Sequence, residues 1–388
     1  SLFRDKTFFD KANDDYGFDI RYYKGHLNEN NVVLTQGADA VCIFVNDIAN
    51  AGIINTLVDN GVKLLALRSA GFNNVDLKAA AGKLPIVRVP AYSPYAVAEY
   101  ALALMLSLNR KIHRAYWRTR DGNFSLHGLM GFDMHGKTVG IIGTGKIARI
   151  LIQILKSFGM NILAYDIYPD TKIAEELQFS YTSLSDLYHH SDIISLHCPL
   201  TDQTRHMINE DSIHMMKGNV RIINLARGGL VNDDDMLAAL ECGKVAAYVT
   251  DFPNNKILQG KNVIPIPHLG ASTPESEENC AVMAAAQTRD FLESGIIRNS
   301  VNLPAVDVAP VSKPRLFCIH ENVPNVLGSI TSAVAGFGLN ISDLVNRSRG
   351  NIAVSVVDLD EAPSEKREAL TQTVKSIAGM KRVRLLGV

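Results

Sequence analysis

The segment from Thr138 to Asp166 constrains the fold of this chain more than any other part of the sequence. It opens with an apolar run, Thr138 to Ile142, and continues through a Gly143-Thr144-Gly145 turn. Apolar residues then recur at helical spacing as far as Phe158, and a second apolar run ends at Asp166. This order predicts a strand, a tight turn, a helix and a second strand, the unit with which a doubly wound parallel sheet begins.

Each residue of the turn has a physical role in binding a dinucleotide. Gly143 permits the sharp turn, and Gly145 has no side chain, so a pyrophosphate can approach the backbone. The helix that starts near Lys146 and Ile147 offers that anion free N–H groups and the positive end of its dipole. Asp166, at the end of the second strand, can accept hydrogen bonds from both ribose hydroxyls and would repel a 2′-phosphate. The sequence therefore predicts NAD, and not NADP, as the cofactor.

Composition argues against several other classes of function. The chain has 388 residues, of which 47% are hydrophobic and 20% charged, a mixture typical of globular proteins with two or three domains. Its formal net charge of −1 provides no field that would recruit nucleic acid or a membrane surface. The one dense basic stretch, residues 110–120, is expected to be a solvated or subunit-facing helix surface.

The cysteines and the N-terminus suggest a cytoplasmic protein. Five cysteines show no paired spacing, and no signal segment or membrane-spanning apolar run is visible in the sequence. Cys42, Cys198 and Cys318 lie in apolar, strand-like runs, so we expect them to be reduced core residues.

The order of the predicted elements indicates an α/β fold with two doubly wound Rossmann-like domains and a smaller C-terminal module. A long apolar-faced helix over residues 94–112 is expected to join the first two domains. The last part of the chain reads strand, helix, strand, strand, helix, strand, which is the ferredoxin-like βαββαβ order. The predicted domains are a substrate-binding domain at 1–98 and 271–307, a cofactor domain at 99–270, a linker at 308–313 and the module at 314–388.

Charged side chains stand at predicted strand ends of the cofactor domain, where ligands of such sheets bind. Arg227 follows the strand RIINLA, and its guanidinium could clamp a substrate carboxylate with two hydrogen bonds. His268 ends the run IPIPHLG and could protonate a carbonyl that accepts hydride. Asp251 ends the strand AYVTD. Taken alone, the arginine could equally be a surface residue and the histidine a hydrogen-bonded structural one.

The ordered motifs GTGKIA, HCPLT, NLARGG and PHLGAST resemble the D-2-hydroxyacid dehydrogenase family. The resemblance implies an NAD-dependent oxidoreductase that moves hydride between the nicotinamide and a small 2-hydroxy or 2-keto acid. It also implies that Arg227 binds the substrate carboxylate, that His268 is the acid/base and that Asp251 contacts the nicotinamide amide. Backbone N–H groups around Ala70 and Gly71 would hold the other carboxylate oxygen. Val45, Asn46 and Tyr92 are also expected to contact the substrate, and the other residues expected to contact the cofactor are Cys198, Pro199, Ala226 and Gly270.

The two halves of the chain resemble different members of this family. Residues 1–205, with LRSAGFNNVDL and SLHCPLT, resemble D-lactate dehydrogenase. Residues 206–388, with KVAAYVTDFP and PHLGASTPESEENC, resemble 3-phosphoglycerate dehydrogenase of serine biosynthesis. That second resemblance implies that the C-terminal module is an ACT domain. It further implies a homodimer or homotetramer in which His320, Asn322 and Asn340 grip L-serine across a subunit interface.

Loops of the first domain are expected to contact the distal group of the substrate. A phosphate there would need arginines or lysines, whereas the loop VNDIAN carries Asp47 and no basic residue. Tyr92 offers an amphipathic wall. We therefore favour pyruvate and D-lactate over 3-phosphohydroxypyruvate, and Arg68 or Arg88 would argue against this choice if they faced the cleft.

One departure from the family pattern concerns the catalytic histidine. The resemblance implies a glutamate paired with it shortly after Asp251, but an ungapped count places Lys256 there, and matching the Phe-Pro pair places Asn255. Neither residue is a carboxylate that could raise the pKa of His268 and set its tautomer. The sequence therefore suggests a weakened enzyme, with an NAD-dependent sensor as the alternative from another class. Because the two resemblances meet near residue 205, a third alternative is that the chain is an engineered mosaic of two dehydrogenases.

Overall fold

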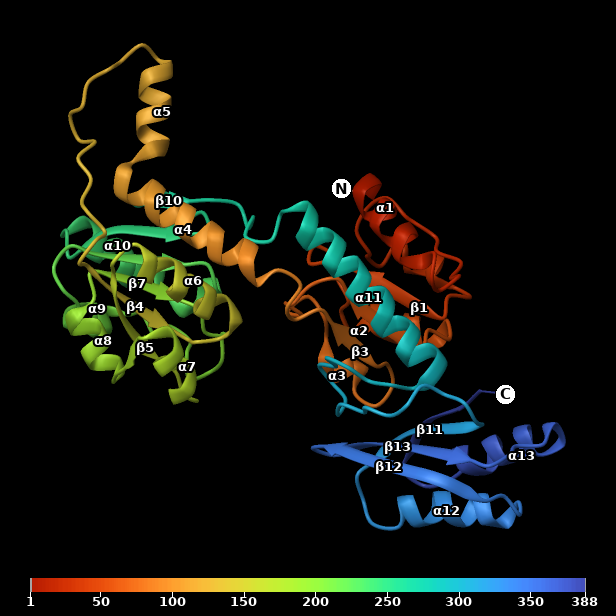
Figure 1. Ribbon diagram of the computed structural model, residues 1–388. Helices are drawn as coiled ribbons and strands as arrows, with labels where there is room; N and C mark the ends of the chain where they lie inside the picture. The colour runs from red at the N-terminus through yellow and green to blue at the C-terminus, as the bar shows by residue number, and fades with distance from the viewer. Residues whose placement is uncertain (1, 388) are drawn as a thin grey trace. The chain divides into compact units, whose positions relative to one another are not determined.

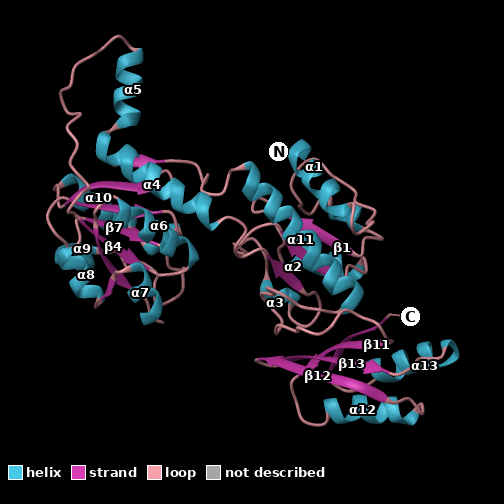
Figure 2. Ribbon diagram, viewed as in Figure 1, coloured by secondary structure: helices cyan, strands magenta, loops and turns pink. Residues whose placement is uncertain are grey.

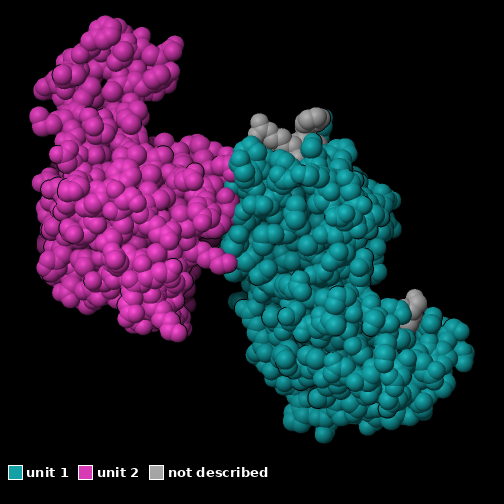
Figure 3. Space-filling view, in the orientation of Figure 1, with its two compact units in different colours: residues 1–92, 274–388 teal, residues 93–273 magenta. Residues whose placement is uncertain are grey.

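The computed structural model describes residues 2–387, which form two compact units. Figure 3 colours them separately: one unit comprises Ser1–Tyr92 and Pro274–Val388, and the other comprises Ser93–Thr273. Figures 1 and 2 trace their helices and strands. None of the described helices combines the length and the apolar character that crossing a bilayer requires.

The unit Ser93–Thr273 is built on a seven-stranded parallel sheet in the order β10-β9-β8-β7-β4-β5-β6. The order turns back at β4, which lies between β5 and β7, so the predicted doubly wound sheet is confirmed for this unit. Ligands of such sheets bind at this switch point. The strands are β4 (Thr138–Ile142), β5 (Asn161–Tyr165), β6 (Ser180–Tyr181), β7 (Ile193–Leu196), β8 (Val220–Asn224), β9 (Val245–Thr250) and β10 (Val263–Pro265).

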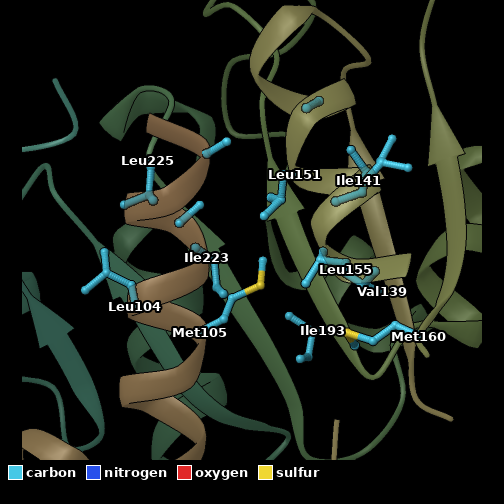
Figure 4. Packing of buried hydrophobic residues seen from close by; sticks show 14 of the residues in the cluster. Leu104, Met105, Val139, Ile141, Leu151, Leu155, Met160, Ile193, Ile223 and Leu225 are labelled. Carbon is cyan, nitrogen blue, oxygen red and sulfur yellow. The ribbon is translucent and has the colours of Figure 1, made fainter. Parts of the chain in front are cut away.

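Alternate strand residues of this sheet pack against helices on opposite faces. On one face, Ile141 packs with α4 and α6, as Figure 4 shows for Met105 and Leu151. On the other face, Ile142 packs with α8 and α10. The helices of the unit are α4 (Pro94–Arg110), α5 (Ile112–Arg120), α6 (Lys146–Ser157), α7 (Thr171–Leu177), α8 (Leu184–His190), α9 (Glu210–Met215) and α10 (Asp233–Glu241).

The other unit contains a three-stranded parallel sheet of β1 (Ala40–Ile43), β2 (Leu64–Leu67) and β3 (Ile86–Arg88), in that order. The sheet is parallel and helices cover both of its faces, and the order of these described strands follows the chain without a reversal. Its helices are α1 (Leu2–Asn13), α2 (Ala51–Asp59), α3 (Leu77–Ala80) and α11 (Pro274–Ser294).

Strand β2 shows how this sheet is buried on both faces. Leu65 packs toward α2, whereas Leu64 packs toward Phe291 of α11. Edge strand β1 is less covered, and Cys42 on it is exposed, so the prediction that Cys42 is a core residue was wrong. Cys318 is buried, as expected, and Cys198 is half-buried.

The C-terminal part of the chain is a separate antiparallel sheet in the order β12-β13-β11-β14. Cys318 of β11 faces the two helices, and its neighbour Phe317 faces α11 and the segment that follows it. The elements follow the predicted βαββαβ order: β11 (Arg315–Glu321), α12 (Val326–Gly336), β12 (Ile341–Arg349), β13 (Ile352–Leu359), α13 (Ser364–Lys375) and β14 (Met380–Leu386).

Arginines attach this sheet to the rest of its unit. Buried Arg315 forms a two-pronged ion pair with Asp358, with Nη2 2.8 Å from Oδ2, and its Nη1 donates to the carbonyl of Ser294 at 2.8 Å. Arg384 donates to the carbonyls of Phe291 and Leu292 in the last turn of α11, where the helix dipole favours a cation. The sheet is therefore held by hydrogen bonds as well as by apolar packing.

Candidate active site

The glycine turn leaves a space of the right kind for a phosphate. Gly143 has φ +95, and a Cβ there would lie 2.8 Å from the backbone nitrogen of Cys198, so only glycine fits. A Cβ on Gly145 would meet no protein atom within 4 Å, and no side chain caps the start of α6 at that residue. The first turn of α6 is therefore open to an anion.

Asp166 is fixed beside this turn by hydrogen bonds. Its Oδ2 accepts from the backbone N–H of Thr144 at 2.7 Å and from the Thr144 hydroxyl at 2.9 Å, and its Oδ1 accepts from the N–H of Tyr168 at 2.9 Å. Burial opposes ionisation of the carboxyl, but these hydrogen bonds outweigh it and lower the pKa of Asp166. An ionised acceptor thus stands at the end of β5.

Arg227 is presented by a loop that buried Asn224 holds in place. The Asn224 Oδ1 accepts from the N–H groups of Ala226 and Arg227 at 3.2 and 3.3 Å, and its Nδ2 donates to the Arg227 carbonyl at 2.9 Å. Nδ2 also lies 3.3 Å from the Tyr248 hydroxyl. The Arg227 side chain is half-buried, and its Nη1 donates to the Ala226 carbonyl at 2.6 Å.

His268 is paired with Asp251. Nδ1 of the ring lies 2.7 Å from Oδ2 of the carboxylate, and the Asp251 side chain is 1% exposed whereas that of His268 is 57% exposed. A carboxylate can only accept, so this bond requires a proton on Nδ1 and leaves Nε2 for a substrate. The other oxygen of Asp251, Oδ1, is buried and has no hydrogen-bond partner among residues 2–387.

This pairing corrects the expectation that the histidine lacks a carboxylate. Lys256 instead forms an exposed ion pair with Asp234 at 2.7 Å, and Asn255 is exposed, with no contact to His268 among the described interactions. Positions 255 and 256 therefore do not supply the partner of the ring. The end of β9 supplies it, four residues earlier than the nearer of the two positions.

Two aromatic residues that were not expected from the sequence support the histidine. The Phe252 ring lies 4.9 Å from the His268 ring and also packs beside Gly228, next to Arg227. Tyr100 of α4 donates from its hydroxyl to the Pro267 carbonyl at 3.2 Å. Burial and the nearby Asp251 charge raise the pKa of Tyr100 to about 12, so it remains a donor. Phe252 thus links the two predicted catalytic side chains within one unit.

The loop expected to hold the substrate carboxylate lies in the other unit. The carbonyl of Ala70 accepts from Arg88 Nη1 at 2.8 Å, and the carbonyl of Gly71 accepts from the Ser69 hydroxyl at 2.8 Å. In a trans peptide the next N–H points away from the carbonyl. The N–H of Gly71 therefore points away from the Arg88 guanidinium.

The remaining predicted residues are distributed over both units. Val45 and Asn46 are exposed on the loop after β1, and Tyr92 is half-buried beside Cys280. Cys198 and Pro199 follow β7, and burial raises the pKa of the Cys198 thiol to about 11. Ala226 follows β8, and Gly270 packs against Tyr100.

Comparisons with known proteins agree with this arrangement. The family model described as "D-isomer specific 2-hydroxyacid dehydrogenase, NAD binding domain" matches residues 102–270. D-lactate dehydrogenase of Escherichia coli (strain K12) is 48% identical over 253 residues, which are 65% of this chain and 77% of that protein. The chain belongs to the D-isomer-specific 2-hydroxyacid dehydrogenase family. It is accordingly an NAD-dependent oxidoreductase.

Solved structures of other dehydrogenases of this kind show the same fold. The apo-structure of D-lactate dehydrogenase from Escherichia coli aligns with a TM-score of 0.71 and 42% identity, covering 78% of this chain and 98% of that one. D-lactate dehydrogenase from Aquifex aeolicus, complexed with NAD and lactic acid, aligns with a TM-score of 0.65 and 29% identity, over 74% of this chain and 92% of that one. The alignments therefore include nearly all of each of these two structures, whereas about a quarter of this chain lies outside them.

The structure does not bring the three predicted serine-binding residues of the dehydrogenase together within one chain. Asn322 donates to the Gly350 carbonyl at 3.1 Å, whereas Asn340 donates to Asp360 at 2.6 Å, at the opposite end of β13. His320 is buried, and its ring nitrogens lie 2.8 Å from the Glu321 carbonyl and 2.8 Å from the Ser355 hydroxyl. A site made of all three would need a second copy of the chain.

Proposed function

We propose that this dehydrogenase reduces pyruvate to D-lactate with NADH and catalyses the reverse reaction. The single observation that supports a working enzyme best is the hydrogen bond between His268 and the buried carboxylate of Asp251. The D-lactate dehydrogenase of Escherichia coli, at 48% identity, supports the choice of substrate. The same pair argues against the sensor alternative, since proton transfer is the step that the sensor would lack.

The residues around the glycine turn suit an NAD molecule. The open space at Gly145 and the uncapped start of α6 would receive the pyrophosphate, and Asp166 would accept the ribose hydroxyls. The unpartnered Oδ1 of Asp251 is an acceptor for which the nicotinamide amide is a suitable donor. When bound, NADH supplies the hydride for C2 of the keto acid.

Arg227 and His268 would act on opposite ends of the reacting group. The guanidinium of Arg227 would bind the substrate carboxylate with two parallel hydrogen bonds. His268 would donate the proton on Nε2 to the carbonyl oxygen as the alkoxide develops, and Asp251 would stabilise the ring while it is charged. In the oxidation direction, Nε2 would take the hydroxyl proton back.

The first-domain loops favour a methyl group over a phosphate at the distal end of the substrate. Arg68 stacks on the Phe44 ring with its Cζ 4.5 Å from the centroid, and Arg88 binds the Ala70 carbonyl and lies over Phe72. Both arginines therefore have partners in their own domain. Val45, on the loop after β1, is exposed and apolar. A dianion would need basic side chains there.

NADH oxidation measured with two substrates tests this proposal. We expect turnover with pyruvate and a kcat/KM at least about 100-fold lower with 3-phosphohydroxypyruvate, because the loop after β1 offers a dianion no basic side chain. A preference for the phosphorylated substrate would establish the 3-phosphoglycerate dehydrogenase alternative. Tight NADH binding without turnover of either compound would establish the sensor.

The C-terminal module remains the basis for a second proposal, that the chain is an ACT-regulated enzyme that binds L-serine. Its support is the βαββαβ order and the resemblance of His320, Asn322 and Asn340 to serine-binding positions. Calorimetric titration of L-serine into the wild type and Asn340→Ala tests it. We expect binding to be lost in the variant, and equal binding in both would remove Asn340 from the site.

A homodimer through the cofactor domain is the assembly that the exposed side chains favour. Helix α5 and the loop after it expose Trp117 at 65%, Leu126 at 83% and Met130 at 88%. Large exposed apolar side chains on a helix and the loop that follows it are typical of an interface. Light scattering of the wild type and Trp117→Asp tests this, and we expect a dimer that the substitution weakens.

A further inference from the structure

A cavity of about 420 Å³ lies in the unit that holds both termini, between the segment after α11 and the end of β12. One wall includes Asn299, Ser300 and Leu303, and the opposite wall is made by Arg347, Ser348 and Arg349. None of these residues belongs to the predicted catalytic or serine-binding sets. The cavity is therefore a separate feature of the fold.

The wall formed by β12 is positively charged and lacks a counter-charge. Arg347 and Arg349 are two residues apart on a strand and therefore share one face. Their cross-strand neighbours on β13 are Val354 and Ile352, and neither arginine forms an ion pair within residues 2–387. Arg347 Nη1 reaches only the carbonyl of its neighbour Asn346, at 3.2 Å.

The other wall supplies no carboxylate either. Arg349 Nη1 lies 3.3 Å from the carbonyl of Ser300 and 3.5 Å from that of Leu303, so it touches the wall through backbone oxygens. The acid nearest in sequence, Asp307, does not line the cavity and lies 3.4 Å from Arg298. The two guanidinium groups thus face a hollow without an acidic partner.

Charged residues on edge strands commonly serve to discourage pairing with another sheet. Arg347 and Arg349 are both exposed, but they also line a hollow that has a second protein wall. Like charges on one strand face repel each other, and a bound anion would offset that repulsion. We propose that this cavity binds a small organic phosphate, with its phosphate group held by Arg347 and Arg349. A cavity of this size exceeds what a phosphate group alone would fill, and Leu303 provides an apolar wall for the remainder.

The cavity wall is connected to the loop that carries Ala70. The carbonyl of Asn299 accepts from the N–H of Arg88 at 3.2 Å, and the Arg88 side chain donates to Ala70 at 2.8 Å. The N–H of Val301 is bonded to the Ile86 carbonyl at 3.0 Å. A ligand that orders the wall will therefore slow amide exchange at Arg88 and Val301, a readout that does not depend on turnover.

Calorimetric titration of glycerol 2-phosphate into the full chain, saturated with NADH so that the pyrophosphate site is filled, tests the proposal. We expect Arg347→Gln and Arg349→Gln each to weaken binding about ten-fold, because each removes a charge-assisted hydrogen bond. Arg21→Gln, an equal change of charge at an exposed arginine of the same unit, should leave the affinity unchanged.

Arg347→Gln is the more decisive variant, since Arg347 makes no bond to the opposite wall and its loss should not disturb packing. No binding to the wild type, or equal affinity in the wild type and Arg347→Gln, would overturn the proposal. Inorganic phosphate that binds as tightly as glycerol 2-phosphate would overturn the assignment of an organic ligand.

Discussion

Asp251 and His268 form a hydrogen bond of 2.7 Å between a side chain that is 1% exposed and one that is 57% exposed. Asp251 directly follows β9, so its buried carboxylate binds Nδ1 of the His268 ring. The other ring nitrogen, Nε2, is left accessible. The geometry of a carboxylate–histidine pair is therefore complete without a residue from the loop after Phe252.

Asp251→Asn should lower kcat for pyruvate reduction about 100-fold, within the range for general acid–base catalysis, because the amide cannot stabilise a charged ring. Steady-state NADH oxidation measures this effect. Asn255→Glu and Lys256→Glu serve as matched controls in the adjacent loop, and we expect neither to raise kcat near neutral pH. A substantial gain from either would show that the loop, and not β9, provides the effective acid.

Asn224→Ala should raise the KM for pyruvate about ten-fold and leave the Kd for NADH nearly unchanged. The substitution removes the hydrogen bonds that shape the loop before Arg227, and each such buried bond contributes about 1 kcal/mol. Tyr248→Phe, which removes only the 3.3 Å contact to the same amide, should have a small effect. Equal losses in the two variants would contradict a positioning role for Asn224.

Gly143→Ala and Gly145→Ala should separate folding from cofactor binding. A Cβ at Gly143 would lie 2.8 Å from backbone atoms at φ +95, so we expect a fall in Tm of several degrees. The space at Gly145 is open, so its variant should keep the wild-type Tm but bind NADH at least about ten-fold more weakly, because the methyl group occupies the phosphate approach. Thermal melts and fluorescence titration with NADH test both statements.

Thiol reactivity should divide the five cysteines into two groups. Burial raises the pKa of Cys198 to about 11 and that of Cys318 to about 12, so these thiols stay protonated as the pH rises through 8. Cys280 is buried, while Cys42 and Cys242 are exposed. With DTNB at pH 8 we expect two thiols to react rapidly and all five to react in denaturant. Rapid reaction of a third thiol in the folded protein would show that the interior opens.

Arg315→Met should destabilise the unit that contains both termini by about 3–5 kcal/mol, the usual loss when one partner of a buried ion pair is removed. Urea unfolding followed by circular dichroism measures the change. The double variant Arg315→Met/Asp358→Leu should recover part of the loss, because it leaves no charge without a partner. Similar stability of the single variant and the wild type would mean that apolar packing alone holds the C-terminal sheet.

The sequence was most informative where a local pattern determines the structure. The glycine turn, the apolar period of α6 and the acid after β5 are short-range features, and they predicted the strand-turn-helix-strand unit directly. The order of strand-like and helix-like runs likewise predicted the βαββαβ order of the C-terminal sheet and its helices. Such features depend on nearest neighbours, which the sequence shows without reference to the rest of the fold.

Contacts between distant segments were not predictable in the same way. The pairing of His268 with Asp251 joins the ends of two strands, and an alignment to family motifs directed attention to Asn255 and Lys256 instead. Tyr100 on a helix gave no sign that its hydroxyl reaches Pro267. The order of β1, β2 and β3 is also a property of the assembled sheet. In each case the deciding information is a distance between residues far apart in the chain.

The way Arg384 meets the end of α11 bears on how this protein can be divided or recombined. The Arg384 guanidinium donates hydrogen bonds to the carbonyls of Phe291 and Leu292. Burial together with the Arg382 charge lowers the pKa of Arg384 to about 10. Cutting the chain ahead of β11 would leave those carbonyls and the apolar surface beside Phe291 exposed to water. A graft of the C-terminal sheet onto another enzyme would therefore have to include the last turn of α11.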